Sequence, residues 1–263
     1  MVARQEDQAR RAARAVSLTA DLRGKSALVT GASSGLGAHF ARLLARSGAK
    51  VILAARRKPV LDEMVAEIAK KGGLASALAL DLTDERSITE AVEAAGPIDV
   101  LVNNAGVNIA KPVLEQSAQD WDEVVDTNLR GAFLIATEVA RGMRGGGSIV
   151  NIASIGGIRQ SSQVTPYAVS KAGVIQMTKQ LALEPARFDI RVNAIAPGYF
   201  ETDLNRDFLA SEAGEMIRHR IPQRRFGRPE ELDGALLLLC SDASRFMTGS
   251  VIAVDGGHLT SGL

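Results

Sequence analysis

The sequence is poor in cysteine, histidine and aromatic residues, and each scarcity excludes a class of protein or site. Cys240 is the only cysteine among 263 residues, which excludes an intrachain disulfide and a metal site built from cysteines. The three histidines lie far apart in the sequence, so we expect no bound metal. Aromatic residues make up 4% of the chain and hydrophobic residues 46%, so the core must consist mainly of Ala, Val, Leu and Ile. That composition favours helices packed on a parallel sheet over a β-sandwich.

Long apolar runs and an excess of charge of either sign are also absent. No run approaches the ~20 residues that span a bilayer, and 31 Lys and Arg balance 30 Asp and Glu. We therefore expect neither a membrane nor a nucleic acid as a partner. Residues 1–20 lack the apolar segment of a secretory signal, which predicts a cytoplasmic protein whose residues 1–21 form a disordered or helical arm. The four arginines of this arm leave open a nucleic-acid or membrane contact through it.

Short apolar runs alternate with longer helical patterns from Ser26 onward. The runs lack the apolar–polar alternation of half-exposed strands, as expected of strands covered on both faces. The expected fold class is α/β: a Rossmann-type, doubly wound, seven-stranded parallel sheet with helices on both faces, in a single catalytic domain over residues 22–263. The expected strands are 26–30, 51–54, 75–80, 100–103, 148–152, 190–195 and 251–254, and the expected helices lie near 36–47, 59–71, 84–95, 117–143, 166–187 and 229–241.

The stretch 198–222 is less regular than the rest of the domain and carries several charges. It is long for a connection inside a compact domain. A substrate lid and an ordinary surface insertion are both consistent with this pattern.

The first expected strand runs into a glycine-rich turn, Thr30-Gly31-Ala32-Ser33-Ser34-Gly35-Leu36-Gly37, and a helix follows. Glycines permit a tight turn and close approach of a pyrophosphate, and the helix N-terminus supplies free N–H groups. The spacing is G-x-x-x-G-x-G rather than G-x-G-x-x-G. The turn predicts a dinucleotide site that contains Gly31, Ser33, Ser34, Gly35, Leu36 and Gly37.

The end of the second expected strand indicates which nicotinamide cofactor is preferred. An NAD-preferring fold usually places Asp or Glu there, to bind the adenosine ribose. Here Ala55 is followed by Arg56 and Arg57. Because a guanidinium binds a 2′-phosphate, the pair favours NADP(H), with Arg56 as the first contact and Arg57 as a helper. If both arginines are merely solvated, NAD(H) remains possible.

Tyr167 and Lys171 are four residues apart in an expected helix, so their side chains address one site. A free tyrosine has a pKa of about 10, too high for efficient proton transfer at neutral pH. A neighbouring ammonium, together with the positive ring of oxidised nicotinamide, should lower the pKa of the phenol. The pair therefore predicts Tyr167 as a general acid and base.

The pair belongs to a set of motifs in a fixed order. The others are the glycine loop of residues 30–37, Asp81, Asn103-Asn104-Ala105-Gly106, Asn128, Ser154 and Pro197-Gly198. With these motifs, the sequence from about Leu22 to Gly262 resembles the short-chain dehydrogenase/reductase (SDR) family, in its compact single-domain branch.

The resemblance implies four catalytic residues. Ser154 would hydrogen-bond the substrate carbonyl, and Lys171 would hold the nicotinamide ribose and tune Tyr167. Asn128 would anchor a water that relays protons to Lys171. An exposed polar residue is the alternative for Asn128, which is a poor helix former inside the expected helix 117–143.

The resemblance also implies further cofactor contacts. Asn104 would lie against the adenosine ribose, and Asn103 would instead tie neighbouring strands together. The family more often has Ile where Phe200 stands, and some NADP-dependent members carry a basic residue at the position of Ser34. The cofactor contacts implied by resemblance are Asp81, Leu82, Asn104, Ala105, Gly106, Tyr167, Lys171, Pro197, Gly198 and Thr202.

The reaction expected from these features is hydride transfer between nicotinamide and a carbonyl carbon, which interconverts a ketone and a secondary alcohol. The substrate is a small molecule, either a 3-oxoacyl thioester or another small ketone or alcohol. An NAD(H)-dependent alcohol or polyol dehydrogenase and a non-catalytic dinucleotide sensor are the alternatives. The last strand and its turn, Val251 to Gly257, resemble a subunit interface of relatives, which implies a homotetramer.

Overall fold

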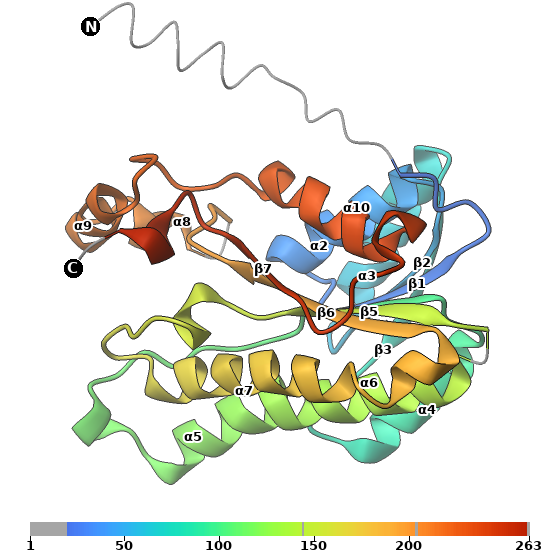
Figure 1. The fold of residues 1–263 in the computed structure, drawn as a ribbon, viewed down its shortest axis with the longest axis horizontal. Coiled ribbons are helices and arrows are strands. Elements are labelled where there is room, and N and C mark those ends of the chain that lie inside the picture. The colour runs from blue at the N-terminus through green and yellow to red at the C-terminus, as the bar shows by residue number, and fades with distance from the viewer. Residues whose placement is uncertain (1–19, 144, 203–204, 262–263) are drawn as a thin grey trace, which may run out of the picture.

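A computed structural model describes residues 20–143, 145–202 and 205–261 (Figure 1). Seven parallel strands form one sheet in the order β3-β2-β1-β4-β5-β6-β7, which confirms the predicted fold class and the single sheet. The direction of winding reverses between β1 and β4, and in open α/β sheets ligands bind outside the carboxyl ends of strands at such a point. The strands are β1 (Ser26–Thr30), β2 (Lys50–Ala55), β3 (Leu74–Ala79), β4 (Val100–Asn103), β5 (Gly147–Ile152), β6 (Ile190–Pro197) and β7 (Val251–Val254).

Helices cover both faces of the sheet (Figure 1). Successive strand residues point to opposite faces: Ala27 and Val29 of β1 join one core cluster, whereas Leu28 joins the other. Both faces are therefore buried, which is why the strands read as continuous apolar runs. One face carries α2 (Gly35–Arg46), α3 (Lys58–Lys70) and α10 (Asp233–Cys240), and the other carries α4 (Glu85–Ala95), α5 (Ala118–Val125), α6 (Gly131–Gly142) and α7 (Thr165–Leu181).

Three helices differ from the sequence-based expectation. The helix expected over 117–143 is divided into α5 and α6 by a π-helical turn at Asp126–Arg130. The helix expected to reach residue 187 ends at Leu181, and Pro185 begins a separate 3₁₀ turn. Proline disfavours helical geometry in the residue before it, which accounts for an early end. The helix expected from residue 229 begins with a 3₁₀ turn, and its α-helical part starts at Asp233.

The irregular stretch after β6 contains two short helices, α8 (Arg206–Leu209) and α9 (Glu212–Arg220). They lie beyond the end of the sheet, on the same side as the C-terminal segment (Figure 1). Ile221, which follows α9, packs with Leu209 and Phe226 in a small apolar cluster of its own. This segment therefore adds side chains to the edge of the sheet where the strands end.

Two further observations concern the N-terminal segment and the cysteine. Residues 1–19 of the predicted arm lie outside the described residues, and Leu22 is already packed in the core. Cys240 is buried, and burial raises the pKa of its thiol to about 12, so Cys240 is a structural thiol rather than a reactive one. Within the described ranges, no helix has both the length and the apolar character that a membrane crossing requires.

Candidate active site

The glycine loop joins β1 to α2 at the carboxyl edge of the sheet. Gly31 has a φ of 66°, and a Cβ there would lie 2.8 Å from the Cα of Ala105. A side chain at Gly37 would collide with the carbonyl oxygen of Gly31. Ser34 makes no side-chain capping bond to α2, and the first helical turn carries no acidic residue. The N–H groups and the positive end of α2 thus fit the pyrophosphate that the sequence predicts here.

Arg56 and Arg57 follow β2 at the same edge, and both are exposed. The Nη2 atom of Arg57 donates to the hydroxyls of Ser33 at 3.0 Å and Ser34 at 3.3 Å. The arginine expected to be the helper is therefore the one tied to the glycine loop. The loop places a hydroxyl pair and a guanidinium together, and this donor set suits a phosphate.

Asp81 is the only carboxylate among the described residues that line the cleft. Its Oδ1 atom accepts hydrogen bonds from the N–H of Thr83 at 2.9 Å and from the Thr83 hydroxyl at 2.7 Å. These bonds, and to a smaller extent the charge of Arg56, hold the pKa of Asp81 below its ordinary value. Asp81 is thus an ionised acceptor beside Leu82, where the sequence predicts the adenine contact.

The ends of β1 and β4 are held together by Thr30. Its hydroxyl accepts from the N–H of Asn104 at 2.9 Å and of Ala105 at 3.0 Å, and its carbonyl accepts from the Asn104 side chain at 3.0 Å. Asn103 points elsewhere: its amide donates to Asn151 of the neighbouring strand at 3.2 Å. As expected, Asn103 ties strands together, while Asn104 to Gly106 line the cleft.

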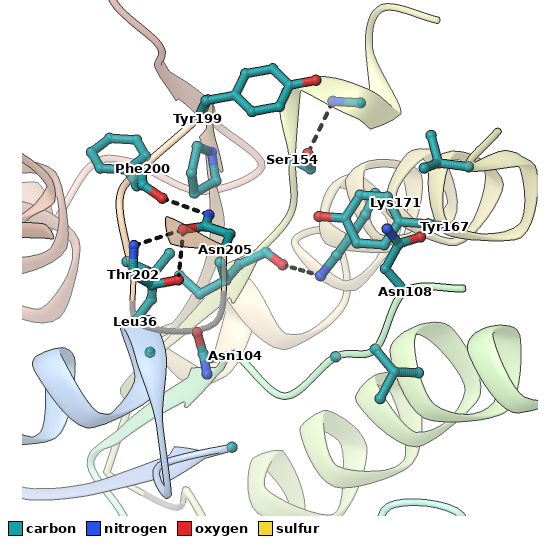
Figure 2. Close-up of a pocket in the computed structure, with 18 of the residues that line it drawn as sticks. Leu36, Asn104, Asn108, Ser154, Tyr167, Lys171, Tyr199, Phe200, Thr202 and Asn205 are labelled. Carbon is teal, nitrogen blue, oxygen red and sulfur yellow. Dashed lines mark hydrogen bonds between the residues drawn. The ribbon is translucent and has the colours of Figure 1, made fainter. Parts of the chain in front are cut away.

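Tyr167, Lys171 and Ser154 converge at the carboxyl end of β5 (Figure 2). Tyr167 and Lys171 lie one turn apart on α7, and the Lys171 Nζ atom is 5.7 Å from the centre of the Tyr167 ring. That Nζ atom donates to the carbonyl oxygen of Ile152 at 2.8 Å. The Ser154 hydroxyl accepts from the N–H of Gly156 at 3.0 Å and lies close enough to Tyr167 to lower its pKa. The three polar groups predicted to act together therefore share one end of the cleft.

Burial disfavours charge on both members of the Tyr–Lys pair. It raises the pKa of Tyr167 above 10.0; the Ser154 hydroxyl opposes this rise, and Tyr199 adds slightly to it. Burial also lowers the pKa of Lys171 to about 8. The expectation that Lys171 lowers the pKa of Tyr167 is therefore wrong for the protein alone, because burial raises this pKa and Lys171 is not among the groups that lower it. A phenolate at this position needs further positive charge.

Asn128 is the one predicted site residue that does not line the cleft. It is 1% exposed and lies in the π-helical turn, so it is not an exposed polar residue. Its Oδ1 accepts from the N–H of Val107 at 2.7 Å, and its Nδ2 donates to the Val107 carbonyl at 2.8 Å and to the Ser170 hydroxyl at 3.1 Å. Asn128 thus fastens the loop after β4 to α7, beside the catalytic pair.

Pro197, Gly198 and Thr202 line the cleft after β6, as the sequence predicts. The N–H and hydroxyl of Thr202 donate to the Asn205 side chain at 2.8 and 3.1 Å. Phe200 stands where the family more often has Ile. It is 5% exposed and packs on Gly227, where an added Cβ would lie 2.5 Å from the Phe200 ring. Gly227 thus makes room for the larger side chain at position 200.

The cleft has a volume of about 1380 Å³ and contains every predicted site residue except Asn128. The sequence motifs did not predict several residues that line the substrate end of the cleft: Asn108, Arg159, Arg220 and His258. They come from loops and from the end of α9, where no periodic pattern or motif marks them. In the described part of the chain, no cluster of three or more His, Cys, Asp or Glu side chains could hold a metal ion.

Comparison with known proteins agrees with this geometry. Residues 31–258 match the family described as enoyl-(acyl carrier protein) reductase. The chain is 44% identical to 3-oxoacyl-(acyl-carrier-protein) reductase FabG of Thermotoga maritima, over 90% of this chain and 98% of that protein. It is 40% identical to gluconate 5-dehydrogenase of Gluconobacter oxydans, over 91% of this chain and 96% of that protein.

A solved structure gives the same picture. The gluconate 5-dehydrogenase of Burkholderia cenocepacia, in complex with NADP and tartrate, has a TM-score of 0.89 and 34% identity, and the match covers 92% of this chain and 98% of that one. Fold, site geometry and relatives therefore agree, and the chain belongs to the short-chain dehydrogenase/reductase family.

Proposed function

We propose that this NAD(P)-dependent oxidoreductase, which acts on CH–OH donors, interconverts a ketone and a secondary alcohol with Tyr167 as its general acid and base. The observation that carries the proposal is the meeting of Tyr167, Lys171 and Ser154 at one end of the cleft. The glycine loop and two arginines lie at its other end. In this arrangement a dinucleotide and a carbonyl compound would bind next to each other in the cleft.

Each polar group then has a distinct role. The bound nicotinamide supplies the hydride for the carbonyl carbon, or accepts it in the reverse direction. Tyr167 donates its hydroxyl proton to the carbonyl oxygen during reduction and takes it back during oxidation. Ser154 donates a hydrogen bond to the same oxygen as negative charge develops there. Lys171, buried beside the ring of Tyr167, holds the nicotinamide ribose and supplies positive charge.

Asn128 is proposed to complete this set as the anchor of a proton-relaying water. Its support is indirect: Asn128 fixes Val107 and Ser170 around the catalytic pair. The remaining predicted cleft residues are proposed as cofactor contacts.

The proposed cofactor is NADP(H), with NAD(H) as an alternative. The hydroxyl–guanidinium set of Ser33, Ser34 and Arg57 supports a 2′-phosphate at this position, as does the lack of an acid after β2. NADP is also bound in the Burkholderia relative. The comparison of specificity constants for NADPH and NADH tests this, and a preference for NADH would overturn it. Replacing Arg57 with Ala should remove most of the preference for NADPH.

The remaining proposals concern organisation. Residues 22–263 form the catalytic domain, preceded by the arm of residues 1–21. Residues 198–222 act as a substrate lid, which is supported by Phe208, Met216 and Arg220 lining the cleft. A homotetramer is proposed from the family resemblance, and the cytoplasmic location stays a prediction from the sequence. Light scattering after size exclusion tests the tetramer.

The reaction is tested with purified protein, NADPH and a panel of ketones that includes 3-oxoacyl thioesters, keto sugars and keto acids. The proposal expects oxidation of NADPH that depends on at least one ketone, and the corresponding alcohol as product. Cofactor binding without turnover of any ketone would contradict the proposal and favour a dinucleotide sensor.

A further inference from the structure

Among the described residues, the substrate end of the cleft is lined by positively charged side chains and by no carboxylate. Arg159 comes from the loop after β5, Arg220 is the last residue of α9, and His258 belongs to the turn after β7. All three line the cleft, although they are distant in sequence. The only acidic residue among the described residues of the lining is Asp81, and it lies at the dinucleotide end.

Arg220 is an uncompensated cation. In the described part of the chain its side chain has no hydrogen bond and no ion pair, although it is on the same helix as Glu215. Glu215 instead pairs with Arg218 and His219. The charge of Arg220 is therefore available at the wall of the cleft.

Arg159 is held in place by the C-terminal segment. Its Nη1 atom donates to the carbonyl oxygens of His258 at 2.8 Å and Ser261 at 3.2 Å, and to the Ser261 hydroxyl at 3.1 Å. All its side-chain hydrogen bonds within the described residues come from this one nitrogen. The rest of the guanidinium keeps its donors for a ligand.

His258 adds a neutral ring to the same end of the cleft. The residue is 8% exposed, and its Nδ1 atom is buried without a hydrogen-bond partner among the described residues, out of reach of a ligand in the cleft. Burial, followed by the charge of Arg159, lowers the pKa of His258, so the ring is neutral at neutral pH.

Tyr199 connects this charged end to the proposed reaction centre. Its ring packs on that of His258, with centroids 5.8 Å apart and planes inclined by 33°. Its hydroxyl end points toward the side of the site that holds Ser154 (Figure 2), and Tyr199 contributes to the raised pKa of Tyr167. A substrate whose carbonyl lies at Tyr167 would therefore extend along Tyr199 toward the two arginines.

We infer that the substrate is a small ketone that bears a carboxylate, bound by Arg220 and Arg159. The inference rests on the proposed function and names its substrate class. A planar guanidinium binds a carboxylate with paired hydrogen bonds, and two such groups, with no acid beside them among the described lining residues, favour an anion strongly. Asn108, Ser161 and Ser162 also line this end, and they suit the hydroxyl groups of a polyhydroxy acid better than an acyl chain.

The test compares matched pairs of acid and neutral ketones with NADPH. The pairs are 5-keto-D-gluconate with L-sorbose, which has CH₂OH in place of the carboxylate, and levulinate with methyl levulinate. We expect kcat/KM to be at least about tenfold higher for the acid of a pair, which corresponds to one charge-assisted contact. The preference should weaken as NaCl is added, because salt screens the attraction.

The variant Arg220→Gln isolates the charge. It should raise KM for the keto acid by about tenfold, with kcat and the rate on the neutral ketone unchanged. Arg218→Gln is the matched control, since Arg218 is on the same helix but does not line the cleft, and it should change neither.

The outcomes separate the inference from the proposed function. Equal rates on acid and neutral ketones, or equal losses on both in Arg220→Gln, would overturn the carboxylate site and leave the ketone reductase intact. The carboxylate site would also be overturned, in favour of a phosphorylated substrate, by one further result. This result is a larger increase in kcat/KM from dihydroxyacetone to dihydroxyacetone phosphate than from a neutral ketone to its matched keto acid. Failure to reduce any ketone of the panel would instead remove the proposed function itself.

Discussion

Tyr167 is buried where a negative charge must form during alcohol oxidation, and its surroundings resist that charge. Because its pKa is raised, the phenol of the free protein stays protonated at neutral pH, ready to act as an acid in carbonyl reduction. Oxidation needs the phenolate, which in the free protein becomes populated only at high pH. The positive charge of oxidised nicotinamide is the contribution that would bring the pKa down.

This prediction is measurable because the chain has two tyrosines, Tyr167 and Tyr199. Phenolate absorbance is titrated in wild type and in Tyr167→Phe, and the difference reports Tyr167. We expect ionisation above pH 10 in the free protein and at lower pH with NADP⁺ bound. A difference signal below about pH 8 without cofactor would contradict the burial argument, since a free tyrosine ionises near 10.

Lys171 shows the cost of placing a cation in the core. Its pKa falls from 10.5 to about 8 on folding, so between these values the unfolded chain binds more protons than the folded one. Stability should therefore rise with pH in that window. Relative to Lys171→Met, wild type should gain about 2 kcal/mol between pH 7.5 and 9.5. Urea unfolding at both pH values measures this difference, and a constant difference would exclude a lowered pKa.

At the scale of elements, the π-helical turn between α5 and α6 determines where the loop after β4 lies. Such turns occur often at functional sites. Here the turn directs Asn128 into the interior, where both polar atoms of its side chain bind the backbone of Val107. This interaction is long-range, so no helical periodicity in the sequence could reveal it.

Replacing Asn128 with Ala would leave the part-buried N–H of Val107 without its acceptor. We expect a loss of about 3 kcal/mol in the free energy of unfolding, together with a fall in kcat, because the loop beside Lys171 shifts. Unfolding and kinetics on the same preparation test this. If the relay role also holds, Asn128→Ala alters the pH profile of kcat; unchanged stability would contradict the structural role.

Phe200 and Gly227 link the segment after β6 to the chain that leads into α10. In Gly227→Ala the new methyl group would meet the Phe200 ring at 2.5 Å, and overpacking of this kind costs about 1–3 kcal/mol. The displaced segment should also weaken NADPH binding. Adding Phe200→Ile, which shortens the side chain, should restore both properties. Equal stability of Gly227→Ala and wild type, measured by thermal unfolding, would show that the contact is unimportant.

The sequence predicted elements well where local pattern and burial agree, and less well where tertiary contacts intervene. All seven strands were located, because strands buried on both faces are marked by uninterrupted apolar runs. The helix expected over 166–187 was extended too far past Leu181, and the one over 117–143 was not seen as two. In both cases only a few residues interrupt or end the helix, within a sequence that otherwise favours one.

At the scale of the whole molecule, the dinucleotide end of the cleft was predictable and the substrate end was not. Parallel strands bring their carboxyl ends to one edge, so Gly31, Asn104 and Ser154 had to meet there. Arg159, Arg220 and His258 meet only because two short helices and the C-terminal turn fold back over that edge. No spacing in the sequence encodes this, because it depends on packing between distant loops.

The proposed mechanism requires Tyr167 to move the proton. The most direct measurement is a single turnover of NADPH with a reducible ketone, in wild type and in Tyr167→Phe, with NADPH affinity measured on the same samples. We expect hydride transfer to slow by at least about 100-fold, with NADPH affinity and folding unchanged, since the variant lacks only the hydroxyl. A rate in Tyr167→Phe close to that of wild type would contradict the account.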